Sequence, residues 1–253
     1  MKKLILVLLA FSLLLSSCDQ KNKVDKTYYD NGLTFSLEKV TKHFLFYSEK
    51  KDKSCLKGLS ISLESNFDRI TTDLDCKIDF KTKVIIYPDI KTFHISTDLM
   101  HLDDNFIGTA TKKEIKIVSP LNPGPKHYYS EFFILIQHEF SHTVLYNIGE
   151  DIPVWLSEGT AMLEAKQGND DMISQIVAKN GIPSIKELES LDYFTSNYGH
   201  YYSYSLVKYI ADNYGQDKLN LLIRHFSEIK ATLGVDMEEL WKNWSDYLKK
   251  EYN

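Results

Sequence analysis

The feature that most constrains this chain is a pair of histidines four residues apart, His138 and His142, inside the apolar run 130–149. A helix brings residues i and i+4 to the same face, one turn apart, so both imidazoles should project together. Ser130 is placed to cap the start of such a helix, and Gly149 lies just beyond its end. The fold must therefore bury an apolar helix and keep two imidazoles on one face of it.

Two imidazoles with this spacing can occupy two corners of a tetrahedral zinc site. Glu158, in the segment WLSEGTA (155–161), follows as a candidate third ligand. A fourth position would stay open for water, and Glu139, between the histidines, would act as general base. The alternative is a pair of packed or surface histidines. Burial on an apolar helix weakens that alternative, because buried polar groups need partners. We therefore expect one Zn²⁺ ion.

Length and composition fit an ordinary globular protein with one sizeable or two small cores. The chain has 253 residues, of which 43% are hydrophobic and 26% are charged. Its net charge is −5, and its lysines are scattered among acidic residues. No basic face suited to nucleic acid is visible in this pattern, so we expect no nucleic-acid partner.

Residues 1–17 predict a signal peptide. Two lysines precede the apolar stretch 4–15, which is shorter than the ~20 residues that a spanning helix needs. The segment Leu-Ser-Ser-Cys that ends at Cys18 resembles a bacterial lipobox, so we predict lipidation of Cys18; a plain secretion signal is the alternative. Residues 18–34 are polar and predict a flexible tether. The protein should then lie outside the cytoplasm, anchored by lipid to a bacterial membrane, at the cell surface or the periplasmic face.

Cys55 and Cys76 are the other two cysteines of the chain. Outside the cytoplasm such a pair often forms a disulfide. Residues 59–71, however, predict a helix of about 20 Å between them, whereas the Cα atoms of bridged cysteines lie within ~7 Å of each other. The sequence leaves both outcomes open.

The order of predicted elements indicates an α+β fold over residues 35–253. A β-rich part, about 35–128, has predicted strands at 42–48, 83–88 and 114–118 and a helix at 56–74. An α-rich part, about 129–253, has the histidine helix, a helix after Pro153, a short helix opened by a capping box at Ser184, and helices at 201–214, 218–229 and 237–248. The histidine helix should lie near the seam between two lobes.

The segments HEFSH (138–142) and WLSEGTA together resemble the gluzincin zinc metallopeptidases, and most closely their peptidase-MA-like branch. The likeness extends over about residues 40–250. It implies a thermolysin-like two-lobed fold, a zinc ion held by His138, His142 and Glu158, Glu139 as general base, and a peptide or protein substrate. It also implies an edge strand, Gly108, Thr109 and Ala110, that pairs with the extended peptide.

Two positions depart from the family pattern. Gluzincins often have a tyrosine at the start of a later helix, where its hydroxyl stabilises the oxyanion. The ungapped equivalent here is His200, and a shift of one residue would deliver Tyr201; either could donate that hydrogen bond, or the aromatic cluster could simply pack. Thermolysin-like enzymes also carry an acid four residues after the glutamate ligand, which orients a histidine. This chain has Met162 there, so we expect a backbone carbonyl or another acid to orient the ligands.

Three functions compete on this evidence. The first is a lipid-anchored zinc metallopeptidase. The second is a lipoprotein that keeps the zinc site for structure or for binding a partner, without effective catalysis. The third is a solute-binding lipoprotein without metal. A serine hydrolase has little support, because Ser141 and Ser157 lack the context of a nucleophile elbow.

Overall fold

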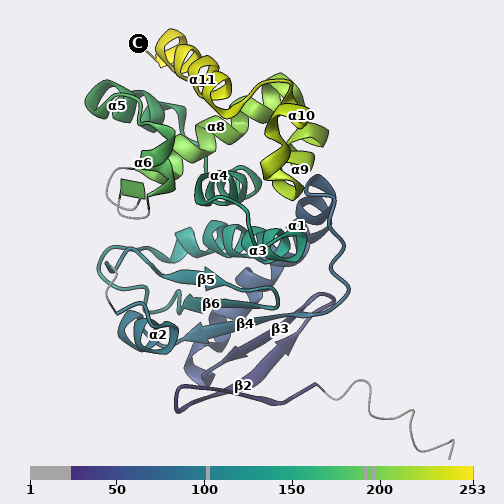
Figure 1. The fold of residues 1–253 in the computed structure, drawn as a ribbon. Coiled ribbons are helices and arrows are strands. Elements are labelled where there is room, and N and C mark those ends of the chain that lie inside the picture. Colours follow the sequence, from purple (N-terminus) through teal and green to yellow (C-terminus); the bar gives the residue numbers. More distant parts are fainter. Residues whose placement is uncertain (1–23, 101–102, 191–192, 195–197, 253) are drawn as a thin grey trace, which may run out of the picture.

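The computed structural model describes residues 24–100, 103–190, 193–194 and 198–252, so the predicted signal peptide and Cys18 lie outside the described residues. The described strands form one six-stranded sheet in the order β1-β2-β3-β4-β6-β5 (Figure 1). Their bounds are β1 (Thr27–Asp30), β2 (Leu33–Val40), β3 (Phe44–Ser48), β4 (Thr82–Tyr87), β5 (Gly108–Ala110) and β6 (Glu114–Val118). The strands predicted around 42–48, 83–88, 108–110 and 114–118 are thus confirmed.

The sheet is parallel at its centre and antiparallel at both sides. β3, β4 and β6 run parallel, whereas β1 and β2 form an antiparallel hairpin on β3 and β5 is antiparallel to β6 at the edge. All five residues of β3 are buried, as expected for a central strand covered on both faces. The edge strand β5 is short, so the sheet exposes little unpaired backbone there.

Aromatic side chains show what covers each face. Successive strand residues point to opposite faces. On one face Phe44 contacts Phe140, with ring centroids 5.2 Å apart, and Phe140 in turn contacts Phe67 at 5.3 Å. On the other face Tyr87 contacts Phe93 at 5.7 Å. The helices that carry Phe67 and Phe140 therefore cover one face, and the helix that carries Phe93 covers the other.

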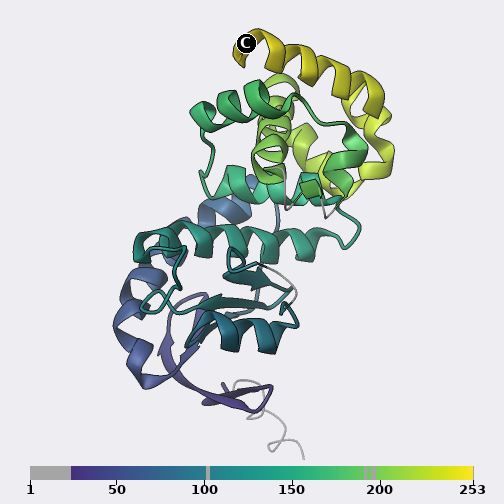
Figure 2. The same cartoon turned by 90° about the vertical axis from the view of Figure 1, so that its left-hand side faces the viewer.

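Helices make up the rest of the described chain. Their bounds are α1 (Leu56–Asp73), α2 (Ile90–Thr97), α3 (Phe132–Ile148), α4 (Val154–Glu164), α5 (Asp170–Asn180), α6 (Ile185–Glu189), α8 (Gly199–Tyr214), α9 (Gln216–Arg224), α10 (Ile229–Leu233) and α11 (Met237–Tyr252). In both views the sheet lies at one end of the molecule and α5 to α11 at the other, with α3 and α4 between them (Figures 1 and 2). The α+β prediction, sheet first and helices after, is confirmed.

The first strand corrects the predicted tether 18–34. Residues 27–30 form β1, which pairs with β2 in the sheet. Tyr28 holds this strand in place: its ring lies 5.6 Å from that of Tyr47, and its hydroxyl donates a 2.9 Å hydrogen bond to Glu114. Asp30 adds an ion pair with Lys116. The polar composition of this segment gave no sign of a strand. The residues that stabilise it lie far away in the sequence, so the local pattern does not reveal them.

Three helical segments also differ from the predictions. The histidine helix α3 begins at Phe132, because Ser130 lies inside a 3₁₀ turn and caps nothing; Gly149 does follow the helix end. The helix predicted at 218–229 is two helices, since the backbone of His225 leaves the helical region (φ −137°, ψ 56°). Residues 170–180, not predicted as helical, form α5. The capping box at Ser184 is confirmed.

The two cysteines that the structure describes are not bonded to each other. Cys55, which is buried, and Cys76, which is half-buried, are both free thiols. They flank α1 at its two ends, and a helix of 18 residues spans about 27 Å. The possible disulfide between them is therefore wrong, because α1 holds the two cysteines too far apart for a bond.

None of the helices in the described part of the chain combines the length and the apolar character that a bilayer span requires.

Candidate metal centre

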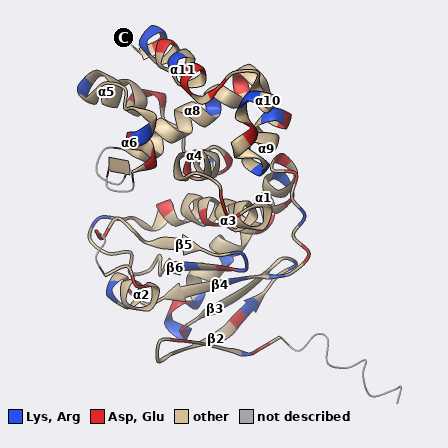
Figure 3. Cartoon of the chain, viewed as in Figure 1, with Lys and Arg blue, Asp and Glu red and all other residues tan. Residues whose placement is uncertain are grey.

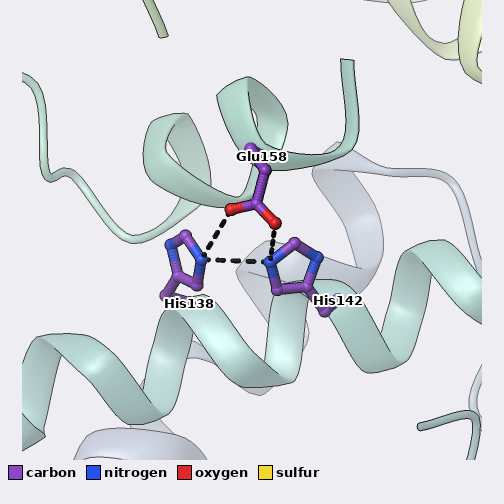
Figure 4. Close-up of side chains that lie close together, drawn as sticks. All are labelled: His138, His142 and Glu158. Atoms are coloured by element: carbon purple, nitrogen blue, oxygen red, sulfur yellow. Dashed lines mark hydrogen bonds and ion pairs between the residues drawn. The ribbon is translucent and has the colours of Figure 1, made fainter. Parts of the chain in front are cut away.

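The two histidines of the motif leave α3 on the side that faces α4. Residues 138–145 are all buried, because α3 lies between the sheet and α4. Pro153 precedes α4, and Glu158 projects from that helix towards the two imidazoles (Figure 4). The predicted helical spacing and the predicted second helix thus bring the three candidate ligands together.

The three side chains converge on one point. His138 Nε2 and His142 Nε2 are 3.0 Å apart. Glu158 Oε2 lies 3.4 Å from His138 Nε2, and Glu158 Oε1 lies 3.4 Å from His142 Nε2. One ligand atom from each residue lies within 4.8 Å of the others. These three residues could hold a metal ion.

Hydrogen bonds on the far side of each ring favour the nitrogen that faces the site. His138 Nδ1 lies 2.7 Å from the side-chain oxygen of Gln167, which can only accept, so Nδ1 carries the proton and Nε2 offers a lone pair. His142 Nδ1 lies 3.2 Å from Ser157 Oγ. Ser157 Oγ can accept a hydrogen bond from His142 Nδ1, and in that tautomer two lone pairs and a carboxylate face one another. Such a cluster is electrostatically unfavourable without a cation, and it matches the donor set of a zinc site.

The end of α4 positions Gln167. Lys166 adopts the left-handed conformation (φ 56°) directly after the helix. The backbone N–H of Gln167 then donates to Met162 O at 2.9 Å, and that of Lys166 donates to Leu163 O at 3.1 Å. This pair of bonds is the Schellman pattern, which turns the chain back over the last turn. Gln167 is thereby aimed at His138.

Charges in the site act strongly on each other. Burial would raise the pKa of Glu158, but when His142 and His138 are protonated, their charges and hydrogen bonds hold it well below its usual range. Burial raises the pKa of Glu139 to about 7; the neighbouring His138 opposes this shift and Glu158 adds to it. Two neighbouring carboxylates are thus given opposite pKa shifts by their surroundings.

The edge strand β5 passes directly over Glu139. A Cβ atom added to Gly108 would lie 2.6 Å from Glu139 Oε1, so a larger residue at this position would require the carboxylate to shift. Gly108, Thr109 and Ala110 form the outermost strand of the sheet on this side. The predicted edge strand is confirmed, and its binding of a peptide stays a prediction.

The two candidates for the oxyanion donor are placed differently. His200, in the first turn of α8, has its Nε2 atom 3.5 Å from Glu158 Oε2, and its ring contacts Phe194 at 4.6 Å. Burial lowers the pKa of His200, whereas the charge of Glu158 opposes this. Tyr201 is half-buried and packs against the hydrophobic core. Of the pair, His200 is therefore the residue that faces the metal ligands.

Three residues near the ligands were missed from the sequence: Gln167, Ser157 and Tyr146. The Tyr146 ring stacks on the His142 ring with centroids 6.1 Å apart. Its spacing, four residues after His142, could have found it, because i and i+4 share a helix face. Gln167 gave no such signal, since the turn that aims it depends on a lysine in an uncommon backbone conformation.

Residues 130–250 match the family model of the Peptidase MA superfamily. The matched segment contains α3 with both histidines, α4 with Glu158, and most of the helical part of the chain. A search of curated proteins finds no match to the chain. The α+β fold is compatible with a peptidase MA fold, the family is typically metal-dependent, and the match suggests a peptidase, which is a hydrolase. The matched segment, with the possible metal site inside it, supports a peptidase-MA-like family for this chain.

Proposed function

We propose that this protein is a zinc-dependent metallopeptidase of the gluzincin type that hydrolyses peptide bonds outside the cytoplasm. The observation that carries the proposal is the convergence of His138, His142 and Glu158, with Glu139 held beside them against the edge strand β5. In the proposed thermolysin-like arrangement, the sheet end and the helical end are the two lobes, and α3 and α4 lie at their seam.

The residues present suit zinc. Two imidazole nitrogens and one carboxylate are a common donor set for catalytic zinc, which leaves a position for water. His138, His142 and Glu158 would hold the ion. When bound, Zn²⁺ would supply Lewis-acid activation of a water molecule near neutral pH.

The remaining steps fall to residues of the chain. Glu139 would accept the proton of the attacking water and pass it to the leaving amine. The substrate would extend along β5, with its backbone paired to the free edge of that strand. His200 would donate a hydrogen bond to the carbonyl oxygen as negative charge develops there. Tyr201, packed on the core, would support the same helix turn.

Glu139→Gln tests the proposal directly. The variant should bind one zinc ion per chain, as measured by elemental analysis, and should lose at least about 10²-fold in peptide turnover, because it has no base. Glu189→Gln, an exposed glutamate on α6, is the matched control and should be unaffected. Unchanged turnover in Glu139→Gln would contradict the mechanism. A wild-type protein that holds zinc but cleaves nothing in a mixed peptide library would favour a non-catalytic zinc lipoprotein.

We further propose that lipid on Cys18 anchors the protein to the bacterial membrane. The lipobox-like segment that ends at Cys18 supports this, as does its place shortly before the first strand at Thr27. Wild-type protein should incorporate labelled fatty acid and sediment with membranes, and Cys18→Ser should do neither. Incorporation of label by the Cys18→Ser variant would rule out this anchor.

A further inference from the structure

An open cavity of about 640 Å³ lies at one end of the edge strand. It is bounded by the turn between β5 and β6 on one side and by the C-terminal part of α3 on the other. Its apolar lining comes from Phe80, Ala110 and Tyr146. A cavity of this size holds a large side chain, and none of its lining residues belongs to the proposed ligand set.

The cavity adjoins the candidate metal centre through Tyr146 and the edge strand β5. Tyr146 lines it and stacks on His142, a proposed ligand, with ring centroids 6.1 Å apart. Along the edge strand, Gly108 lies against Glu139, and Ala110 lines the cavity two residues later. A strand advances ~3.3 Å per residue. In a peptide paired to β5, two or three residues would therefore separate the position beside Glu139 from the one beside the cavity.

The rim of the cavity is basic, in a chain whose net charge is −5. Four lysines and two glutamates line it: Lys81, Lys83, Lys112, Lys113, Glu114 and Glu150. Both glutamates already have partners, since Glu114 pairs with Lys83 at 3.1 Å and Glu150 pairs with Lys112 at 2.6 Å. Within the described residues, no carboxylate pairs with Lys81 or Lys113. The turn between β5 and β6 can be followed in blue in Figure 3.

Lys113 is held near the apolar floor. Its Nζ atom lies over the Phe80 ring, 5.6 Å from the centroid, a cation–π contact. The turn that carries it is fixed at three points: Thr111 N donates to Glu114 O at 2.8 Å, Lys83 N donates to Lys113 O at 2.9 Å, and the Asn147 side chain donates to Lys112 O at 2.7 Å. The positive charge is thus presented from a well-supported turn.

We propose that this cavity is a specificity subsite that takes an acidic side chain of the peptide substrate, and that Lys113 binds its carboxylate. The chemistry is complementary: the aliphatic part of Asp or Glu would lie on Phe80, Ala110 and Tyr146, and the carboxylate would meet a lysine without a carboxylate partner. The inference rests on the proposed function, because it places the peptide along β5. The acidic residue would stand two or three positions from the scissile bond, on the side towards Ala110.

Matched peptides test the subsite on the full zinc-loaded chain. Each position around the scissile bond is occupied in turn by Glu or by Gln, which has nearly the same shape. Wild-type protein should prefer Glu about tenfold in kcat/KM at one position, and the preference should fall as salt is added. Lys113→Gln should lose the preference, and Lys113→Glu should reverse it. Lys179→Gln, an exposed lysine on α5, should keep it.

Binding separates this inference from the proposed function. In the Glu139→Gln variant, affinity for the Glu and Gln peptides is measured without turnover. A Glu preference that Lys113→Gln abolishes supports the subsite even if no peptide is cleaved, in which case only the proposed catalysis fails. Cleavage or binding without a Glu preference, or a preference that Lys113→Gln leaves intact, overturns the subsite. So does a preference that requires a free C-terminal carboxylate and disappears when that carboxylate is amidated.

Discussion

Gln167 orients His138 without touching the place where a metal ion would lie. Its side-chain oxygen accepts a hydrogen bond from His138 Nδ1 at 2.7 Å and so keeps Nε2 available as a ligand. Its backbone is held by the carbonyl of Met162, the residue that stands where thermolysin-like enzymes have an orienting acid. A neutral amide therefore does the orienting in this chain, from a position five residues further along.

Replacement of Gln167 should weaken the metal site while the fold persists. Gln167→Leu removes the acceptor for His138 Nδ1, and loss of such a partner typically costs 10- to 100-fold in metal affinity. Competition with a zinc chelator measures this affinity, and circular dichroism checks the fold. Gln175→Leu on α5, far along the sequence from the ligands, is the control and should bind zinc normally. Equal zinc affinity in Gln167→Leu and wild type would show that the bond orients nothing.

Gly108 sets how closely the edge strand β5 approaches Glu139, the proposed general base. In Gly108→Ala the new methyl group would lie 2.6 Å from Glu139 Oε1, so the carboxylate must move away from the strand. We expect kcat to fall at least tenfold, with normal zinc content and thermal stability near that of wild type. Gly149→Ala is the control, because its Cβ would have only one neighbour, at 3.9 Å. A Gly108→Ala enzyme as fast as wild type would contradict the close approach.

The three candidate ligands could be predicted from the sequence, and the residues that contact them could not. His138 and His142 are set by local helix geometry, and Glu158 stands in a recognisable second segment. Gln167 and Ser157 act through contacts that only the packing of α3 against α4 creates. No spacing rule relates them to their histidines. The tertiary arrangement alone reveals these partners.

At the scale of elements, α4 and α8 pack unusually closely, and Gly159 makes this possible. It follows Glu158 directly and faces the backbone of α8, where an added Cβ would lie 2.3 Å from Ser203 O. The contact also keeps His200, on α8, within 3.5 Å of Glu158, on α4. The helix–helix distance and the shape of the site therefore depend on the same small residue.

Gly159→Ala should damage both stability and the site. The new methyl group would clash with the backbone of α8, which can move only if the two helices separate. We therefore expect a loss of about 1–3 kcal/mol in the free energy of unfolding, measured by urea denaturation. Zinc affinity should also fall, because Glu158 moves with α4. Gly149→Ala again serves as control. Wild-type stability in Gly159→Ala would contradict a packing role for this glycine.

Elements with a strong local pattern were predictable, and those stabilised from afar were not. The helix predicted at 56–74 and observed as α1 has an apolar stripe formed by Leu59, Leu63, Phe67 and Ile70. β1 has only four residues, and its stability comes from the Tyr28 and Asp30 contacts with later strands. The break at His225 has a similar origin, since Phe226 turns to pack on Trp155, with ring centroids 5.9 Å apart. Tertiary contacts override local propensity at both places.

At the scale of the whole molecule, a partly buried ion pair joins α1, which covers the sheet, to the helix that carries Glu158. Arg69 on α1 donates to Glu164 Oε2 at 2.7 Å and to Glu164 O at 2.6 Å, at the end of α4. The Glu164 side chain is only 4% exposed. Burial raises its pKa to about 7, although the charge of Arg69 opposes the shift.

This raised pKa predicts how stability depends on pH. Below the ordinary value of 4.5, Glu164 is protonated in the folded and in the unfolded chain. Between pH 4.5 and about 7 only the folded chain keeps the proton, so the contribution of Glu164 to stability falls as pH rises. The free energy of unfolding of wild type minus that of Glu164→Gln should therefore drop by about 1–3 kcal/mol across this window. Urea denaturation at several pH values measures it.

The exposed Glu189→Gln variant provides the baseline for that experiment, because its difference from wild type should stay flat over the same pH range. A wild-type advantage over Glu164→Gln that grows with pH would mean that Arg69 outweighs burial and that the pKa of Glu164 is lowered instead.

Because β1 begins early in the sequence, a protein anchored through Cys18 could not move far from the membrane. Only residues 19–26 separate Cys18 from the first strand, and a fully extended segment of that length spans at most about 30 Å. Under the proposed lipid anchor, the sheet end would stay within this distance of the bilayer, and the helical end would lie further out. Such an enzyme would meet membrane-associated or newly exported chains far more often than freely diffusing ones.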